Sequence, residues 1–311
     1  MSPITIAVPA TTANLGPGFD CLGAALNLYN HFTFSILPDS EPDFLITVTG
    51  TEADHAVPLR DRVSRDETNL LYQSFLKFYQ HLGQTPPKTK MEIQLGVPLA
   101  RGLGSSATAI VAGLMGANLL AGKPLSGSEI LNLAIAIEGH PDNVAPALLG
   151  NCQLSVKDGE KWQITPLNWH PELIPVVAIP DFELSTEMAR SVLPQHYSRA
   201  DAIFNVAHIA LLVKAIESGR GELLAIAMED KIHQPYRQSL IKGYEAVKTA
   251  AIAAGAYNLV ISGAGPTVLA ITHPEQSLDV QNAIATAWQK EGINAIVSAL
   301  QIDSQGARIT S

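Results

Sequence analysis

Residues 98–107 read Pro-Leu-Ala-Arg-Gly-Leu-Gly-Ser-Ser-Ala, and residues 106–121 are apolar almost throughout. This pattern predicts a glycine-rich turn that opens a helix buried on most sides. Such a turn holds an anion well, because its free backbone N–H groups and the positive end of the helix dipole face the ligand. Gly102 and Gly104 permit positive φ and a close approach of the backbone. We therefore predict an anion-binding loop that needs no lysine of its own.

Ser105 and Ser106 can cap this helix or bind phosphate or a metal ion. A helix with serine caps and flexible glycines is the plain alternative. A P-loop is excluded, because GxxxxGK[ST] requires a lysine after the glycines. Residues 102–107 do match the dinucleotide fingerprint GxGxxA, but that fold needs a strand after the helix. Residues 128–138 predict another helix instead, with Ser126 or Ser128 as its cap.

Alternating and β-branched segments around the loop predict strands, and 3.6-residue spacing predicts helices. In the first half, strands are predicted at residues 4–8, 28–36, 44–48 and 91–95, and helices at residues 68–82, 106–121 and 128–138. Glycine and proline are dense in residues 9–20, which predicts a shaped loop between the first two strands.

The second half has its own order of elements. Strands are predicted at residues 174–179, 259–262, 268–272 and 293–299, and helices at residues 200–217, 222–228, 244–254 and 278–290. This order approximates a split βαβ, ferredoxin-like half. A hairpin turn predicted at residues 158–161 marks the boundary between two domains, residues 1–160 and residues 161–311.

Composition argues against several classes of function. Of the 311 residues, 47% are hydrophobic and 16% are charged, which is typical of a well-buried globular enzyme. The formal net charge of −9, without a cluster of basic residues, argues against a nucleic-acid partner. We expect no membrane span and no signal peptide, because every apolar stretch is too short. Cys21 and Cys152 form no CxxC pair, and two lone thiols suit a reducing cytoplasm.

Three segments together resemble the GHMP kinase family. They are residues 9–20, residues 98–107 and the Ser-Gly-Ala-Gly-Pro-Thr turn at residues 262–267, and their order and separation cover essentially the whole chain. The resemblance implies an α+β fold with a ribosomal S5 domain 2-like N-terminal half and a ferredoxin-like C-terminal half. It also implies ATP as the phosphoryl donor.

Three more specific sequence motifs resemble the homoserine kinase branch of the family. The matching segments are residues 9–23, residues 138–146 and residues 233–237. The resemblance implies transfer of the γ-phosphoryl group of ATP to the hydroxyl group of L-homoserine, on the route to threonine. Dimers are common in the family, so a homodimer is the assembly that the resemblance suggests. The alternatives are another small-molecule kinase of the family, of the mevalonate type, and a non-catalytic sensor of amino acids or nucleotides.

The resemblance also implies which residues bind the amino acid. Arginine suits its carboxylate because the planar guanidinium can pair with both oxygens, and an acid suits its ammonium. The substrate-binding residues implied are Asn14, Asp20, His140, Thr186, Arg190 and Arg237. The plain alternatives are a surface ion pair for each arginine and turn chemistry for Asn14 and Asp20.

The nucleotide and its metal ion are assigned in the same way. The implied ATP-binding residues are Pro98, Leu99, Ala100, Arg101, Gly102, Leu103, Gly104, Ser105, Ser106, Ala107 and Asn69. Ser106 and Glu138 are the candidate ligands of Mg²⁺, which takes few protein oxygens and several waters. The alternative for Glu138 is an acid at a helix end in solvent, because it stands closer to the His-Pro-Asp-Asn run than in some relatives.

The implied catalytic residues are Asn143, Arg190 and Asp142. Phosphoryl transfer through a loose transition state depends on positioning and on charge stabilisation more than on bond-making side chains. Asn143 would therefore orient the acceptor hydroxyl group. Asp142 is the nearest candidate base in the sequence; the alternative is that no side chain acts as a base, as the resemblance implies for this branch of the family.

Overall fold

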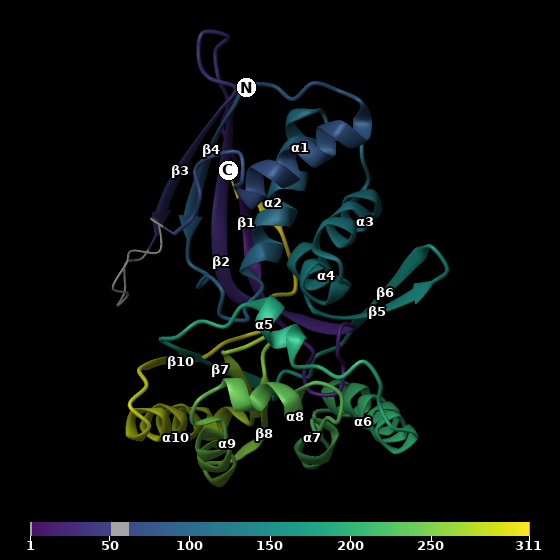
Figure 1. The fold of residues 1–311 in the computed structure, drawn as a ribbon, viewed down its shortest axis with the longest axis vertical. Helices are drawn as coiled ribbons and strands as arrows, with labels where there is room; N and C mark the ends of the chain where they lie inside the picture. The colour runs from purple at the N-terminus through teal and green to yellow at the C-terminus, as the bar shows by residue number, and fades with distance from the viewer. Residues whose placement is uncertain (1, 51–61, 311) are drawn as a thin grey trace.

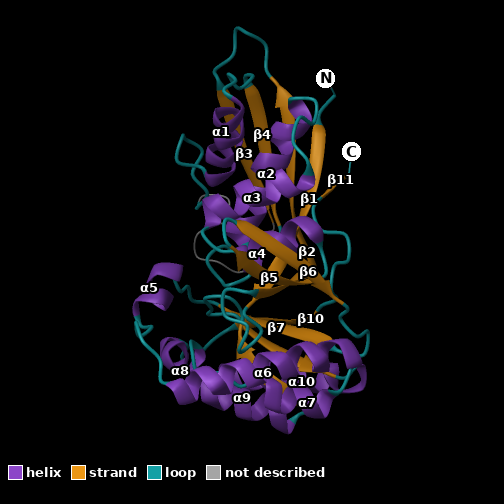
Figure 2. Ribbon diagram, turned by 90° about the vertical axis from the view of Figure 1, so that its right-hand side faces the viewer, coloured by secondary structure: helices purple, strands orange, loops and turns teal. Residues whose placement is uncertain are grey.

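The structure is a computed structural model that describes residues 2–50 and 62–310. Two halves lie along the long axis of the molecule, each with one β-sheet and a layer of helices (Figure 1). Figure 2 shows the helices of the second half packed beneath their sheet, while the short helix α5 (Thr186–Ser191) stands apart near the junction of the two halves.

Among the residues that the structure describes, the first half contains a seven-stranded sheet and four α-helices. Its strands are β1 (Ile4–Ala13), β2 (Leu22–Ile36), β3 (Phe44–Gly50), β4 (Thr89–Leu95), β5 (Cys152–Asp158), β6 (Lys161–Leu167) and β11 (Arg308–Ile309). The sheet order is β11-β1-β2-β4-β3, and β5 pairs with both β2 and β6. The helices are α1 (Leu70–Leu82), α2 (Ser105–Leu120), α3 (Gly127–Glu138) and α4 (Pro141–Leu149). The predicted helix α2 is confirmed, and eleven of its residues are buried.

The prediction of a loop at residues 9–20 is partly wrong, because β1 continues to Ala13. Proline has no N–H for the ladder and is tolerated in sheets mainly at edges and bulges. Here the register shifts between Pro9 and Ala10, so the strand passes the proline and pairs again up to Ala13. The loop is therefore confined to Asn14–Cys21, the connection between β1 and β2.

Helix α4 is absent from the prediction, and it contains two prolines, Pro141 and Pro146. Pro141 stands at the first helical position, where a missing N–H costs nothing. Pro146 lies inside the helix and cannot donate to the carbonyl group of Asp142. That carbonyl faces Gly23, where an added Cβ would lie only 1.7 Å from the oxygen. A glycine on β2 therefore gives this irregular helix room against the sheet.

The second half is an antiparallel four-stranded sheet with the order β10-β7-β9-β8. These strands are β7 (Ile174–Pro180), β8 (Ala256–Ile261), β9 (Val268–Thr272) and β10 (Ala295–Ala299). The helices are α6 (Arg199–Ser218), α7 (Gly221–Ala227), α8 (Gln234–Arg237), α9 (Tyr244–Ala253) and α10 (Ser277–Lys290). Across the sheet, the fourth strand of this half along the chain lies next to the first, followed by the third and then the second. This is the arrangement of the predicted ferredoxin-like half.

The chain crosses between the halves more than once. β6, which follows the hairpin at residues 158–161, pairs with β5 in the first sheet, and β11 returns at the end of the chain to pair with β1. A division at residue 160 would therefore separate β6 from its partner strand. The proposed domains, residues 1–160 and 161–311, remain a prediction.

One hydrophobic cluster joins the halves. The first half contributes Leu15, Leu22, Val97 and Leu103, and the second half contributes Leu212, Leu224, Val260 and Leu269. All of these side chains are buried. Because the interface is apolar and closely packed, the loops of the first half are held at fixed positions over the second.

Asp303 fastens the end of the chain to the first sheet. Its carboxylate accepts hydrogen bonds from Tyr29 Oη (2.7 Å), Arg308 Nη1 (3.0 Å) and the amides of Gln305 (2.9 Å) and Gly306 (2.6 Å). Burial alone would raise its pKa. The hydrogen bond from Tyr29, the two amides and the charge of Arg308 nevertheless hold the pKa of Asp303 below its usual range.

We expect Asp303→Asn to lower the free energy of unfolding by about 1–3 kcal/mol at pH 7, the range for a buried hydrogen-bonded charge. Because the pKa of Asp303 is lower in the folded state, its contribution is present above the unfolded pKa and is lost as pH falls. Urea denaturation at pH 7 and near pH 3 should therefore show a difference that shrinks in acid. Asp39→Asn, at an exposed position, is the matched control, and an equal effect of both substitutions would contradict the role of Asp303.

Candidate active site

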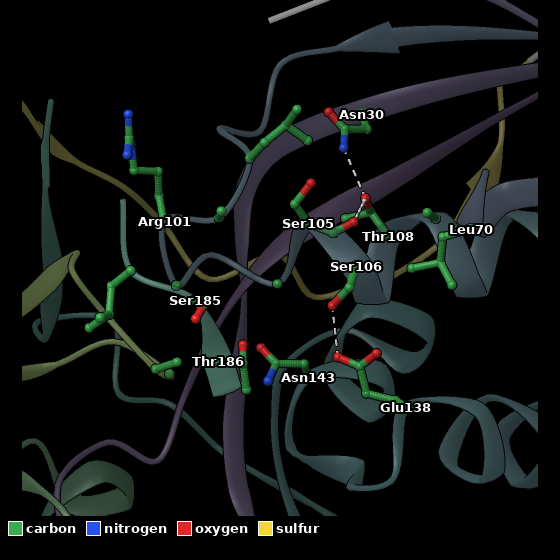
Figure 3. A pocket seen from close by; sticks show the side chains of 18 of the residues that line it. Asn30, Leu70, Arg101, Ser105, Ser106, Thr108, Glu138, Asn143, Ser185 and Thr186 are labelled. Atoms are coloured by element: carbon green, nitrogen blue, oxygen red, sulfur yellow. Dashed lines mark hydrogen bonds between the residues drawn. The ribbon is translucent and has the colours of Figure 1, made fainter. Parts of the chain in front are cut away.

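A cavity of about 620 Å³ lies between the two halves, a size typical of small-molecule sites. The first half contributes the loop at residues 14–20, the loop before α2, the start of α1 and the junction of α3 with α4. The second half contributes α5, α8 and the turn at Gly263–Gly265. Segments far apart in the sequence therefore meet at one site, and Figure 3 shows part of its lining.

The glycine-rich loop opens α2 as predicted. Gly102 and Gly104 have φ of 78° and 66°, in the left-handed region. Gly104 is the N-cap of α2 and offers no side-chain cap, so the positive end of the helix is left for a ligand. Among residues 98–107, Pro98, Leu103 and Ala107 do not line the cavity. Leu103 and Ala107 are buried in the hydrophobic core.

The C-terminal turn packs directly on this loop. Ser262 Oγ donates to the carbonyl oxygen of Gly102 at 2.6 Å, and the amide of Thr267 donates to the carbonyl oxygen of Arg101 at 3.1 Å. The amide of Gly263 donates to the carbonyl oxygen of Ala13 at 3.1 Å. The turn at residues 262–267 therefore fixes the shape of the loop from the other half of the molecule.

Arg101 lines the cavity, but its guanidinium extends away from Ser106 and Glu138 (Figure 3). Nη2 donates to the carbonyl oxygen of Asp181 at 3.2 Å, and Nη1 lies 3.7 Å from Glu183 Oε1. Burial lowers the pKa of Arg101, although the charge of Glu183 acts against this shift. Its side chain thus ties the loop to the segment that leads into α5.

Asn30 is a site residue that sequence reasoning missed. It is buried on β2, where its Oδ1 accepts from the amides of Gly96 (2.8 Å) and Val97 (2.9 Å). Its Nδ2 donates to Thr108 Oγ1 at 2.8 Å (Figure 3). One side chain thereby holds both ends of the segment that carries the glycine-rich loop. The available signal was an asparagine within the predicted strand at residues 28–36, because an amide that becomes buried there needs partners.

Ser106 and Glu138 meet across the cavity as a pair. Ser106 Oγ donates to Glu138 Oε1 at 2.8 Å, as Figure 3 shows. Burial raises the pKa of Glu138, against the opposing effects of Ser106 and His140. A desolvated carboxylate beside a hydroxyl group at a helix N-terminus is a set of hard oxygen donors, which fits Mg²⁺.

His140, Asp142 and Asn143 lie at the start of α4. His140 Nδ1 is 2.5 Å from Asp142 Oδ1, and Asn143 Nδ2 donates to the same oxygen at 3.3 Å. Thr11 Oγ1 donates to Asn143 Oδ1 at 2.8 Å. Burial opposes the charged imidazole, but the hydrogen bond to Asp142 and its charge raise the pKa of His140 above its usual value.

Asp20 and Arg190 form a two-pronged ion pair in the cavity. Arg190 Nη2 lies 2.7 Å from Asp20 Oδ1, and Arg190 Nη1 lies 3.1 Å from Asp20 Oδ2. Asn14 supports this loop, because its Oδ1 accepts from the amide of Asp20 at 3.0 Å and its Nδ2 donates to the Gly263 carbonyl at 2.9 Å. The predicted acid and one predicted arginine are therefore neighbours, and they neutralise each other in this structure.

Arg237, on α8, is 2% exposed. Its Nε donates to the Ala189 carbonyl at 2.9 Å, and its Nη1 donates to the Gly263 carbonyl at 3.2 Å. Burial and then the positive charge of Arg190 lower the pKa of Arg237 to about 10. The buried guanidinium of Arg237, repelled by the charge of Arg190, favours an anion beside it.

The other end of the cavity is apolar. Its wall is formed by Phe32, Val63, Leu70, Leu71, Ile93, Leu95, Leu99 and Ala109. Asn69 also lines this end, but its Oδ1 caps α1 by accepting from Leu71 (3.0 Å) and Tyr72 (3.3 Å). Thr186, a predicted residue, lines the cavity from the first turn of α5. Leu184 and Ser185, which were not identified from the sequence, line it beside Thr186.

Two family models match the chain. The one described as GHMP kinases N terminal domain matches residues 69–151, and the one described as GHMP kinases C terminal matches residues 212–294. The homoserine kinase of Crocosphaera subtropica is 62% identical over 311 residues, which cover 100% of this chain and 99% of the relative. That of a Synechocystis species is 56% identical over 310 residues, with 100% and 99% covered.

Solved structures agree with these matches. The homoserine kinase from Cytophaga hutchinsonii has a TM-score of 0.88 at 29% identity, over 100% of this chain and 98% of that one. The mevalonate kinase of L. major has a TM-score of 0.73 at 14% identity, over 96% and 95% of the two chains, which shows a shared fold. Within residues 2–50 and 62–310, none of the helices is both long and apolar enough to cross a membrane.

Proposed function

The chain belongs to the GHMP kinase family, in its homoserine kinase branch, and from that premise we infer how the site works. The reaction is transfer of the γ-phosphoryl group of ATP to the side-chain hydroxyl of L-homoserine, which gives O-phospho-L-homoserine for threonine biosynthesis. One observation supports our placement of the two substrates: the cavity between the halves has two chemically different sides, which we call its poles. An uncapped helix N-terminus lies on one side, and an acid with two arginines lies on the other.

The nucleotide is assigned to the pole formed by residues 98–107. The positive end of α2 and the left-handed glycines suit the phosphates, and the apolar wall around Phe32 and Ile93 suits the adenine ring. Asn69 takes part by capping α1 at this wall.

Ser106 and Glu138 would hold Mg²⁺ beside the phosphates. The bound metal ion would neutralise charge that develops on the transferred group. Within the described residues, Glu138 Oε2 makes no hydrogen bond, so this carboxylate keeps an oxygen for a ligand. Burial raises the pKa of Glu138 by disfavouring its charged form, an unfavourable effect that a bound cation would relieve.

The amino acid is assigned to the opposite pole. Arg190 and Arg237 would bind its carboxylate, and Asp20 would bind its ammonium, with Asn14 and His140 as further partners. A zwitterion can exchange its two charges for the internal pair of Asp20 with Arg190 without leaving either side chain unpaired. A hydroxy acid without an amino group would leave Asp20 without a cation, which favours an amino acid.

The acceptor hydroxyl would lie near Asn143 and Thr186, between the two poles. Asn143 is fixed by Thr11 and Asp142, so it is preorganised to orient this group. Asp142 remains the candidate base, and Arg190 would stabilise charge in the transition state. The proposal also includes a homodimer and a cytoplasmic location, where the free thiols of Cys21 and Cys152 would stay reduced.

ADP release by the purified protein with MgATP tests the assignment. L-homoserine, mevalonate, shikimate and no acceptor are compared side by side. We expect turnover with L-homoserine alone. Turnover with a different alcohol would leave the phosphate side of the proposal intact and remove the proposed amino-acid pole. Binding without any turnover would favour a sensor on this fold.

Gly102 tests the phosphate loop directly. A Cβ added at Gly102 would lie 2.3 Å from the carbonyl oxygen of Ser262 and 2.9 Å from that of Gly265, at a φ of 78°. Gly102→Ala must therefore push the loop away from the turn, and we expect kcat/KM for ATP to fall by about 100-fold or more, or about 2.7 kcal/mol. Gly127→Ala is the control, because its Cβ would meet open space on an ordinary helix. Similar kinetics for both variants would contradict the role of the loop.

A further inference from the structure

His233 is a buried histidine that does not line the cavity, yet it contacts the parts that do. Its imidazole stacks on the ring of Phe19, with centroids 5.1 Å apart and planes at 22°. The guanidinium of Arg237 lies 5.0 Å from the centre of the same Phe19 ring. His233, Phe19 and Arg237 therefore form one packed group behind the proposed amino-acid pole.

The hydrogen bonds of His233 fix its tautomer. Nε2 lies 2.8 Å from the carbonyl oxygen of Gly16, which can only accept, so Nε2 must carry a proton. Nδ1 lies 3.4 Å from Arg237 Nη1, which can only donate, so Nδ1 must keep its lone pair. A neutral imidazole satisfies both partners at once. Burial, which lowers the pKa of His233, favours this same form.

The backbone of His233 is held as firmly as its ring. Asp230 accepts from the amides of Ile232 (3.0 Å), His233 (2.8 Å) and Gln234 (2.7 Å). Asn205, on α6, donates to Asp230 Oδ1 at 2.8 Å. The first turn of α8 is thereby fixed in position, and with it the direction of the imidazole.

These contacts use most of the guanidinium of Arg237. Nε is taken by Ala189, and Nη1 is shared by Gly263 and His233. Within the described residues, Nη2 makes no hydrogen bond. Arg237 lines the cavity, so Nη2 is the group left to meet a ligand.

We propose that His233 is a positioning residue, which holds Arg237 and the Gly16–Phe19 loop in one arrangement so that Arg237 Nη2 is presented to the carboxylate of the amino-acid substrate. The inference rests on the proposed function, because it assumes that Arg237 binds that carboxylate. It predicts that His233 acts on the amino acid and leaves the nucleotide alone, since none of its contacts reaches residues 98–107.

The test compares His233→Leu, which removes both ring nitrogens, with His233→Gln, whose amide can donate to Gly16 and accept from Arg237. We expect His233→Leu to raise KM for L-homoserine by about 10-fold or more, the scale of a lost positioning contact. KM for ATP and kcat at saturating L-homoserine should stay within about 3-fold, and His233→Gln should recover most of the loss. His196→Gln, at an exposed position, is the matched control. Where the leucine variant does not fold, His233→Phe is measured in its place.

A merely structural role would give a different pattern. Equal increases in KM for ATP and for L-homoserine in the His233 variants would overturn the proposal, and so would a glutamine variant no better than leucine. The variant His233→Leu/Arg237→Met should bind L-homoserine no more weakly than Arg237→Met alone, because His233 acts through Arg237. If Arg237→Met alone leaves KM unchanged, the assignment of the carboxylate fails. If Arg237→Met raises KM for L-homoserine but the His233 variants do not, the inference about His233 fails and the assignment of Arg237 stands.

Discussion

Arg237→Met is expected to raise KM for L-homoserine by about 30- to 4,000-fold, which corresponds to about 2–5 kcal/mol. This is the range for removing one partner of a buried, hydrogen-bonded charge pair. The side chain is 2% exposed, so water cannot replace it easily. Steady-state ADP release with varied L-homoserine at saturating MgATP measures the effect.

KM for ATP should stay within about 3-fold in this variant, because Arg237 lies on the second half, at the pole opposite α2. Arg237→Lys should recover only part of the loss, since an ammonium cannot reproduce the planar fork. Arg199→Met, which removes an exposed arginine at the start of α6, serves as the control for loss of charge. An unchanged KM for L-homoserine in Arg237→Met would remove this residue from the amino-acid pole.

Glu138→Gln is expected to lower kcat by about 100-fold or more, or about 2.7 kcal/mol. The substitution keeps the shape of the side chain and the hydrogen bond from Ser106, but it removes the charge that would hold Mg²⁺. A titration of MgCl₂ at fixed ATP should show half-maximal activity at a higher magnesium concentration.

The stability of the ligand-free protein gives a second, independent readout. Burial opposes the charge of Glu138, so the neutral glutamine should leave the unfolding midpoint at pH 7 unchanged or higher. Glu187→Gln is the matched control, because Glu187 is exposed on α5 and does not line the cavity. An unaltered magnesium dependence in Glu138→Gln would exclude this carboxylate as a ligand.

Much of the site could be predicted because its chemistry lies in local runs of residues. Gly102 and Gly104 adopt the left-handed backbone that a turn into a helix requires, and this requirement can be read from glycine itself. Asp20, His140, Asn143, Arg190 and Arg237 were singled out by motif resemblance, and the fold brings all five to one cavity. Their individual roles remain proposals.

Other features depend on contacts between distant segments, which a local pattern cannot reveal. Asn30 holds the loop through Gly96, Val97 and Thr108, partners that lie 66 to 78 positions away. Helix α4 was not predicted; Pro146 is locally unfavourable inside a helix, and the space for its turn comes from Gly23 on another strand. Strand β11 could not be predicted from the sequence, because it is only two residues long and is defined by its pairing with β1.

The sequence by itself determined the glycine-rich loop, the family and many of the helices and strands, because these depend on backbone preferences and spacing within short segments. Only the tertiary structure decided what each polar side chain contacts. It paired Asp20 with Arg190, directed Arg101 away from Glu138, and surrounded Arg237 with His233, Ala189 and Gly263. The physical reason is that a buried polar group must find its partners wherever the fold places them, and that placement follows from packing over the whole chain.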